Sequence, residues 1–335
     1  MALSDLLRSP VVVAPMAGGP STPALLAGAA SAGAFGFLAA GYKTVPALSA
    51  EVSAVRAAGV TEFGVNVFVP GEPSADAAGL AGYVASLGGG TGEARWDDDR
   101  YDEKVAALLD DPPAAVSFTF GCPSASVISA FRRAGSVVIV TVTSPEEALL
   151  AAEAGADALC VQGVEAGAHR GTFVNDADAL IRDYGLLSLL GLVGSACDLP
   201  LIAAGGLMTA AQVQAVRTAG AVAAQCGTAF LRCPESGAHP LHKAALADPL
   251  STSTALTRAF SGRPARGIVN DFLLAHPGAP AAYPEIHNAT RPLRAAAAAA
   301  GDTSAMSLWA GQGFRLALDR PAAAVAAMLA GVRIV

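Results

Sequence analysis

Apolar residues along the chain fall into eight short runs, most of them followed by a longer segment in which apolar positions recur with helical spacing. Short apolar runs rich in β-branched residues predict buried strands. Several runs are apolar throughout rather than alternating, which is typical of strands that are covered on both faces. We place the strands at Val11–Met16, Phe35–Gly41, Phe63–Phe68, Val116–Gly121, Val137–Val142, Ala158–Gly163, Leu201–Gly206 and Val222–Thr228.

The segments between the strands begin at recognisable helix caps. Ser144 is followed by Pro145 and two glutamates, which places an N-cap, a first-turn proline and two acids in order. Thr209 and Ser21–Pro23 mark two further starts. Eight strand–helix units predict a (β/α)₈ TIM barrel. A doubly wound open sheet is the alternative, but Ala17–Gly19 after the first strand does not provide the Gly-x-Gly-x-x-Gly fingerprint of that fold.

Three stretches depart from the regular spacing and suggest the domain organisation. Residues 70–102 and 171–198 follow the third and sixth strands, and we interpret them as insertions at the barrel rim. We assign residues 1–270 to the barrel and 271–320 to a cap segment. The cap and the insertions together are expected to form a smaller, mainly helical second domain over the barrel mouth. Residues 321–335 are predicted to form a C-terminal helix.

Composition narrows the class of protein. Of the 335 residues, 53% are hydrophobic, which is ample for a large core and argues against disorder. No apolar run is long enough to cross a bilayer, so we expect no membrane segment. The formal net charge is −7 and no Lys/Arg cluster occurs, which argues against a nucleic-acid partner.

Cysteine usage and the N-terminus predict the compartment. Five cysteines, with no Cys-x-x-Cys pair, indicate reduced thiols. The first residues lack the basic-then-apolar pattern of a signal peptide. We therefore expect a cytoplasmic protein, for which a homodimer is compatible with the sequence.

The ends of the seventh and eighth strands are rich in glycine. Ala203–Gly206 ends one strand and Gln225–Thr228 ends the other. In (β/α)₈ barrels the loops after these strands often bind a phosphate through exposed backbone N–H groups. The other interpretation is that glycine allows tight helix–strand packing at these ends.

Two amides lie in or at the end of otherwise apolar strands. Asn66 falls inside the third strand and Gln162 ends the sixth. A buried amide needs hydrogen-bond partners. These two could read the edge of a planar heterocycle, or they could be satisfied by neighbouring backbone.

The segment Gln162–Gly171 is the most informative part of the chain, because a strand end there leads through glycines to polar side chains. His169 sits just past the strand end, beside Arg170 and Gly171, where a histidine can act as a base, a proton donor or an anion-binding group. We predict a functional role for it. For Glu165 and Arg170, a salt bridge or a solvated position is as good an explanation as a catalytic role.

The remaining reactive side chains give weaker signals. Cys122 ends the fourth strand, but no basic neighbour in the sequence would lower its pKa. His239 and His242 resemble a surface pair more than metal ligands, so we predict no metal site.

Several segments, in order along the chain, resemble the motifs of bacterial nitronate monooxygenases. The similarity runs from near residue 10 to near residue 320. One such motif would be a weak sign, but this many in register is a strong one. They are Ala14–Gly19, Gly64–Phe68, Phe120–Pro123, Gln162–Gly171, Ala204–Gly206, Gly227–Leu231, Ser261–Gly267 and Trp309–Gly313.

The resemblance implies a TIM barrel that holds FMN non-covalently, with a smaller second domain. The active-site histidine of the family falls on His169, and Lys43 matches a recurrent segment without an assigned role. The implied FMN contacts are Ala14, Pro15, Met16, Asn66, Gln162, Gly167, Gly205, Gly206, Gln225, Cys226, Gly227 and Thr228.

The resemblance also implies a reaction. An alkyl nitronate such as propionate 3-nitronate would bind beside the flavin, held by protonated His169, and would react with O₂ to give a carbonyl compound and nitrite. The family usually has Gly-Gly before this histidine, whereas Ala168 stands here at the second position. We expect the added methyl group to affect substrate size rather than flavin binding.

Two other functions fit parts of the sequence. An FMN- and NAD(P)H-dependent enoyl-acyl-carrier-protein reductase of the same superfamily shares the Glu-Ala-Gly-x-His segment. A flavin-binding protein without turnover would keep the cofactor contacts and would not depend on His169.

Overall fold

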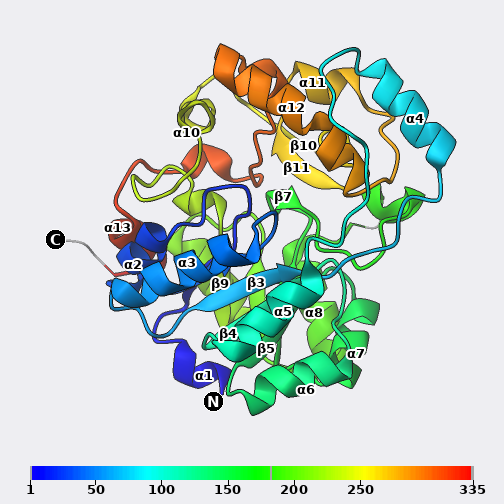
Figure 1. Cartoon of the computed structure of the whole chain (residues 1–335). Coiled ribbons are helices and arrows are strands. Elements are labelled where there is room, and N and C mark those ends of the chain that lie inside the picture. Colours follow the sequence, from blue (N-terminus) through cyan, green and yellow to red (C-terminus); the bar gives the residue numbers. More distant parts are fainter. Residues whose placement is uncertain (1, 182, 333–335) are drawn as a thin grey trace.

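Eight parallel strands form the centre of the computed structural model, which describes residues 2–181 and 183–332. They are β1 (Val11–Val13), β2 (Phe35–Ala39), β3 (Gly64–Phe68), β4 (Ala115–Thr119), β5 (Val137–Val142), β6 (Ala158–Gln162), β8 (Leu201–Ala204) and β9 (Ala223–Cys226). They close into a barrel in the order β1-β2-β3-β4-β5-β6-β8-β9 (Figure 1). β1 pairs with β9 to complete the ring, with Val12 opposite Gln225. The predicted (β/α)₈ barrel is confirmed, and the open-sheet alternative is wrong.

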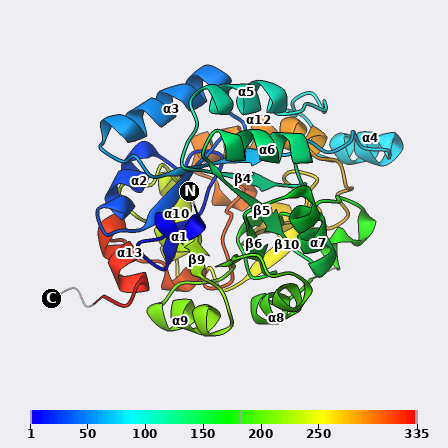
Figure 2. The same ribbon diagram turned by 90° about the horizontal axis from the view of Figure 1, so that it is seen from below.

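A ring of helices surrounds the barrel, as the view from below shows (Figure 2). Its members are α2 (Pro23–Ala30), α3 (Val45–Ala57), α5 (Tyr101–Asp110), α6 (Ala125–Arg133), α7 (Pro145–Ala154), α8 (Leu186–Ala196), α9 (Ala210–Thr218) and α13 (Ala322–Leu329). The predicted C-terminal helix is α13, which contacts α2 and α9 and fills the last place in the ring. Residues 333–335 of the predicted range lie outside the described residues.

The three predicted helix starts have the expected cap geometry. The Ser144 side chain accepts a hydrogen bond from the Glu147 N–H at 3.2 Å, and Thr22 accepts one from Leu25 N–H at 3.0 Å. Thr209 and Gln212 form a capping box. These bonds satisfy N–H groups that a helix end would otherwise leave unpaired.

The bottom of the barrel is closed by apolar packing. The short helix α1 (Leu3–Leu6) places Leu3 and Leu6 against the inward side chains of the strands, among them Val12, Ile139 and Ile202. These side chains are almost fully buried. The interior is therefore solid at this end, and a ligand can enter only at the opposite, carboxyl end of the strands.

A cap covers that carboxyl end (Figure 1). It holds α4 (Ala77–Ser86), from the insertion after β3, together with α10 (Pro240–Ala247), α11 (Asp271–Ala275) and α12 (Glu285–Ala300). It also contains an antiparallel sheet in the order β10-β11-β7, formed by β10 (Thr254–Thr257), β11 (Ala265–Ile268) and β7 (Ala168–His169). The cap thus contains a small sheet in addition to its helices.

The cap sheet joins segments that lie far apart in the chain. β7 follows β6 closely, yet it pairs with β11, so that His169 lies opposite Ala265. β10 and β11 lie within the range 1–270 that we assigned to the barrel. The range 171–198, interpreted as a rim insertion, contains the short 3₁₀ helix η1 (Ala177–Leu180) and the ring helix α8.

Three further 3₁₀ turns complete the described elements: η2 (Thr228–Phe230), η3 (Thr303–Ala305) and η4 (Phe314–Leu316). Among the described residues, no helix has the length and apolar character needed to cross a membrane.

Candidate active site

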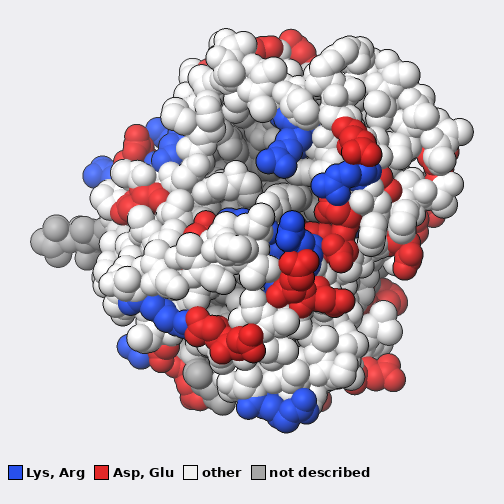
Figure 3. Space-filling model, viewed as in Figure 1, with Lys and Arg blue, Asp and Glu red and all other residues white. Residues whose placement is uncertain are grey.

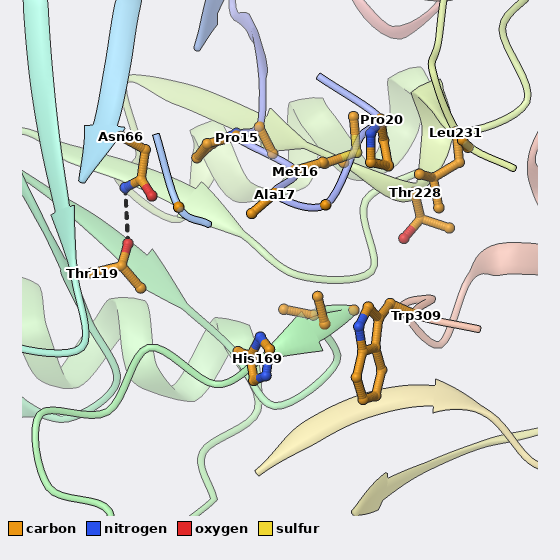
Figure 4. Close-up of a pocket in the computed structure, with 18 of the residues that line it drawn as sticks. Pro15, Met16, Ala17, Pro20, Asn66, Thr119, His169, Thr228, Leu231 and Trp309 are labelled. Carbon is orange, nitrogen blue, oxygen red and sulfur yellow. Dashed lines mark hydrogen bonds between the residues drawn. The ribbon is translucent and has the colours of Figure 1, made fainter. Parts of the chain in front are cut away.

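A cavity of about 600 Å³ lies between the carboxyl ends of the strands and the cap. Every residue that we predicted for the site lines it: Ala14, Pro15, Met16, Asn66, Gln162, Gly167, His169, Gly205, Gly206, Gln225, Cys226, Gly227 and Thr228. Pro15, Met16 and Thr228 lie on one side of this space, and His169 and Trp309 lie on the other (Figure 4). The structure therefore brings the predicted residues together, while their roles stay predictions.

Free main-chain donors line the cavity at the ends of β8 and β9. The backbone N–H groups of Gly205, Gly206 and Gly227 donate to no acceptor among the described residues. Gly205 and Gly206 have φ of +137° and +66°, values that suit glycine and turn the main chain outward. Grouped N–H donors of this kind suit an anion such as a phosphate. This part of the cavity fits the phosphate of a flavin mononucleotide.

Asn66 is anchored through one end of its amide. Its Nδ2 donates to Ser117 Oγ and Thr119 Oγ1, both at 2.9 Å, the second of which is drawn in Figure 4. The Oδ1 atom accepts no hydrogen bond from a described residue and remains available to a ligand. Asn66 can thus present an acceptor to the edge of a heterocycle.

Gln162 is hydrogen-bonded at both ends of its amide. Its Nε2 donates to the His169 carbonyl at 3.1 Å, and its Oε1 accepts from Gly171 N–H at 2.7 Å. Both ends of the amide are thus bonded to the loop that carries His169. These bonds position the histidine loop, and contact between Gln162 and a flavin stays a prediction.

Gly167 is required by the packing of the main chain. A Cβ atom at this position would lie 2.5 Å from Gly311 N and 2.6 Å from the Ala310 carbonyl carbon. No side chain fits at such distances. The glycine allows the segment that follows Trp309 to lie directly against the His169 loop.

His169 is enclosed by rings. Its Nε2 lies 2.9 Å from Ser261 Oγ. Its ring centroid is 5.7 Å from that of Phe120, and 5.5 Å from those of Tyr283 and Trp309. The Nδ1 atom makes no hydrogen bond to a described residue. One ring nitrogen is therefore held in place and the other is left for a ligand.

The surroundings of His169 keep its ring neutral. Burial lowers its pKa to about 3, and the positive charges of Arg263 and Arg294 add to this effect. At neutral pH the imidazole therefore carries no charge. This finding contradicts the protonated His169 that we expected to hold an anionic nitronate.

Positive charge is supplied by arginines instead. Arg263 is 3% exposed; its guanidinium carbon lies 4.1 Å from the ring centroid of Phe120, and its Nη2 donates to the Thr172 carbonyl. Arg294, on α12, lines the cavity. Burial lowers the pKa of each to about 10, so both remain cationic near neutral pH.

The other polar residues of the central segment have structural partners. Both carboxylate oxygens of Glu165 accept the N–H of Leu186, at 3.0 and 3.1 Å, which caps α8. Arg170 is buried, and its backbone N–H donates to the Pro264 carbonyl at 2.8 Å. The structure thus supports the structural reading of both residues.

Cys122 and the histidine pair after β9 also have defined settings. Burial raises the pKa of the Cys122 thiol, which makes it a poor nucleophile. His239 caps α10 through Nδ1. His242 is buried, with Nε2 3.0 Å from the Trp309 carbonyl oxygen, so the expected surface pair is wrong for this residue.

Within residues 2–181 and 183–332, no group of three His, Cys, Asp or Glu side chains is arranged to hold a metal ion.

Ala168 adopts a backbone conformation that favours glycine. Its φ is +62°, in the left-handed region, which costs a residue with a Cβ about 1 kcal/mol. Its pairing with Arg266 across the cap sheet holds it in this conformation.

Several cavity residues were not predicted. Tyr42, Phe68, His287, Arg294 and Trp309 come from separate segments that the fold brings to the same space. Trp309 lies in a motif that we had noted without assigning it a role. The others follow no local pattern that distinguishes them from ordinary core or surface residues.

Comparison with known proteins agrees with this geometry. The family model described as nitronate monooxygenase matches residues 1–330. A nitronate monooxygenase of Pseudomonas aeruginosa is 39% identical over 95% of this chain and 94% of its own length. One from Paraburkholderia phytofirmans is 38% identical over 96% of this chain and 92% of its own.

Solved structures show the same relationship. The crystal structure of a nitroalkane oxidase from Streptomyces ansochromogenes superposes with a TM-score of 0.95 and 50% identity, over 98% of this chain and 96% of that one. The FabK structure from Thermotoga maritima has a TM-score of 0.72 at 24% identity, over 98% and 94% of the two chains, which shows a shared fold. The chain belongs to the nitronate monooxygenase family of flavin-dependent oxidoreductases, enzymes that oxidise nitronates.

Proposed function

We propose that this enzyme binds FMN in the cavity and uses it with O₂ to oxidise alkyl nitronates, such as propionate 3-nitronate, to a carbonyl compound and nitrite. The observation that carries the proposal is that free backbone donors and a neutral histidine line the same cavity. When bound, the flavin supplies the redox chemistry, and the protein supplies placement and charge.

The N–H groups of Gly205, Gly206 and Gly227 would hold the phosphate of FMN, and Asn66 Oδ1 would accept a hydrogen bond from the ring system. Ala14, Pro15 and Met16 would form the apolar floor. These assignments use groups that line the cavity and have no other partner, or that are too small to block it.

His169 would bind the substrate as a neutral group. A nitronate is already an anion, so no base is needed to generate it. Ser261 holds one ring nitrogen, which fixes the plane of the imidazole and leaves the other for the substrate. Arg263 would supply the attraction for the nitronate charge that a neutral imidazole lacks.

The test is to purify the protein, record its visible spectrum and add propionate 3-nitronate under air and under nitrogen. We expect a yellow protein that releases nitrite and consumes O₂ in air. A colourless preparation that FMN does not reconstitute would contradict the cofactor assignment.

Adding NADH under nitrogen separates the enzyme from a reductase. We expect no rapid loss of flavin absorbance, and rapid bleaching would favour the reductase function over the one proposed. A yellow protein that is indifferent to nitronates would instead indicate flavin binding without turnover.

A further inference from the structure

A second cavity, of about 450 Å³, adjoins the first. Tyr42, Lys43, Phe68, His287 and Arg291 line both of them. The Tyr42 and His287 rings stack in this shared wall, with centroids 4.2 Å apart. Figure 3 shows a hollow between the cap and the barrel, with Lys and Arg side chains at its edge. The wall thus separates the proposed active site from an outer chamber.

Most cations that line the two cavities are neutralised by an acid. Lys43 pairs with Glu51, Arg95 with Asp97 at 3.4 Å, and Arg100 with Glu103 at 3.3 Å. The exceptions are Arg291 and Arg294, neither of which forms an ion pair with a described residue.

Arg294 is held in place by neutral groups. Its Nε donates to Thr290 Oγ1 at 3.2 Å, and its Nη2 donates to the His287 carbonyl oxygen at 3.0 Å. Its Nη1 has no hydrogen-bond partner among the described residues. The guanidinium is therefore oriented, with one end still able to donate.

Arg291 and Arg294 lie three residues apart on α12, where two like charges repel each other. His287, one turn earlier, does not offset this charge, because burial and the charge of Arg294 lower its pKa well below its usual value. An anion bound between the two guanidinium groups would relieve the repulsion. Arginine suits a carboxylate, which it can contact through two parallel hydrogen bonds.

This anion would differ from the FMN phosphate. Phe68, in the same wall as Arg291, ends β3, whereas Gly205 and Gly206 follow β8. In the closed order of eight strands β3 and β8 are four places apart, and so lie on opposite sides of the barrel. The arginine pair is thus across the cavity from the predicted phosphate site, and the charge of Arg294 lowers the pKa of His169.

We propose that Arg291 and Arg294 bind a carboxylate at the far end of the substrate, so that the enzyme selects nitronates that carry a second, acidic group. The proposal rests on the function proposed above. Arg294 binds the carboxylate inside the active-site cavity. Arg291, which is more exposed and lines both cavities, attracts it from the outer chamber.

The test compares two three-carbon nitronates, propionate 3-nitronate and propyl-1-nitronate. Only the first of them carries a carboxylate. In the Arg291→Gln/Arg294→Gln double variant, we expect kcat/KM for propionate 3-nitronate to fall about 10- to 100-fold, mainly through KM. The value for propyl-1-nitronate should change less than about threefold, because this compound has no carboxylate for the two arginines to bind. Arg294→Lys should fall between the wild type and the double variant.

Arg95→Gln is the matched control, because Arg95 lines the outer chamber but is paired with Asp97. It should leave the ratio of the two kcat/KM values unchanged. An equal fall for both nitronates in the double variant would overturn the proposal, because it would show a general attraction for anions. No change for either would overturn it as well.

A binding measurement keeps this test separate from that of the proposed function. Calorimetric titration of the FMN-loaded enzyme with succinate and with butyrate needs no turnover. We expect the double variant to raise the Kd of succinate about tenfold and to leave that of butyrate unchanged. Equal effects on the two acids would count against the arginine pair, whereas a wild-type enzyme that binds succinate but oxidises neither nitronate would contradict only the proposed function.

Discussion

The barrel wall and the cap wall enclose the same cavity but offer a ligand different groups. The barrel side presents main chain and small or apolar side chains, as at Pro15 and Met16 (Figure 4). Gly205, which follows β8, also belongs to this side. The cap side presents rings and arginines, such as Trp309 and Arg294. Backbone donors are fixed by the barrel itself, whereas side chains can be exchanged without altering the strands. We infer that the barrel wall serves the cofactor and that the cap wall determines the substrate.

Among the substitutions that test this difference, His169→Ala is expected to have the largest effect. We expect kcat/KM for propionate 3-nitronate to fall about 100-fold, because an oriented hydrogen-bonding group is lost beside the substrate. The FMN content should stay close to that of the wild type, because the barrel wall is intact. The measurements are nitrite release and visible absorbance.

His276→Ala is the matched control. His276 lies in the cap, its ring 5.7 Å from that of Tyr83, and does not line the cavity. Its activity should stay within about threefold of the wild type. Loss of flavin from the His169 variant would contradict the division between the two walls.

A smaller effect is expected from Gly167→Ala. The new Cβ would lie 2.5 Å from Gly311 N, so the two segments must move apart, at a cost of about 1–3 kcal/mol in the free energy of unfolding. Gly191→Ala, in α8, is the matched control, because no atom lies within 4 Å of its new Cβ. It should be neutral or stabilise by up to about 1 kcal/mol. Thermal unfolding of both variants measures the contrast, and equal melting temperatures would contradict it.

The last prediction concerns the pH dependence of stability. His169 has a folded-state pKa of about 3, below its ordinary value of 6.5, so between these values the unfolded chain binds the extra proton. The free energy of unfolding should therefore rise as the pH increases from about 3 to 6.5. Above pH 6.5 His169 is neutral in both states, so its contribution to the free energy of unfolding no longer changes with pH.

In His169→Ala the slope between pH 4 and 6.5 should fall by as much as about 1.4 kcal/mol per pH unit. Denaturant unfolding at several pH values measures it. An unchanged slope would show that the imidazole is as accessible to protons in the folded state as in the unfolded one.

The barrel could be predicted from the sequence because each strand carries its own signal. A run such as Val137–Val142 is β-branched at every position, and its neighbours in the sheet are also its neighbours in the chain. The cap sheet carries no comparable signal. β7 has only two residues, and it becomes a strand by pairing with β11, about a hundred residues away.

The barrel side of the site could be predicted for the same reason, since its residues cluster at strand ends. The charge state of His169 could not, because it depends on burial and on Arg263 and Arg294, which only the fold brings close. Which backbone groups bind the Gln162 amide could not be predicted either, because the path of the next loop decides it. The cytoplasmic location and the homodimer stay predictions.

The pairing of β7 with β11 ties the histidine to the cap rather than to the barrel. Only the short segment 163–167 separates β6 from β7, and the Gln162 amide binds the loop beyond it. Any hinge motion that lifted the cap sheet would carry His169 with it and break the two Gln162 bonds. The movement that opened the cavity would also displace His169. A substrate could therefore contact the complete active site only when the cap sheet was in its closed position.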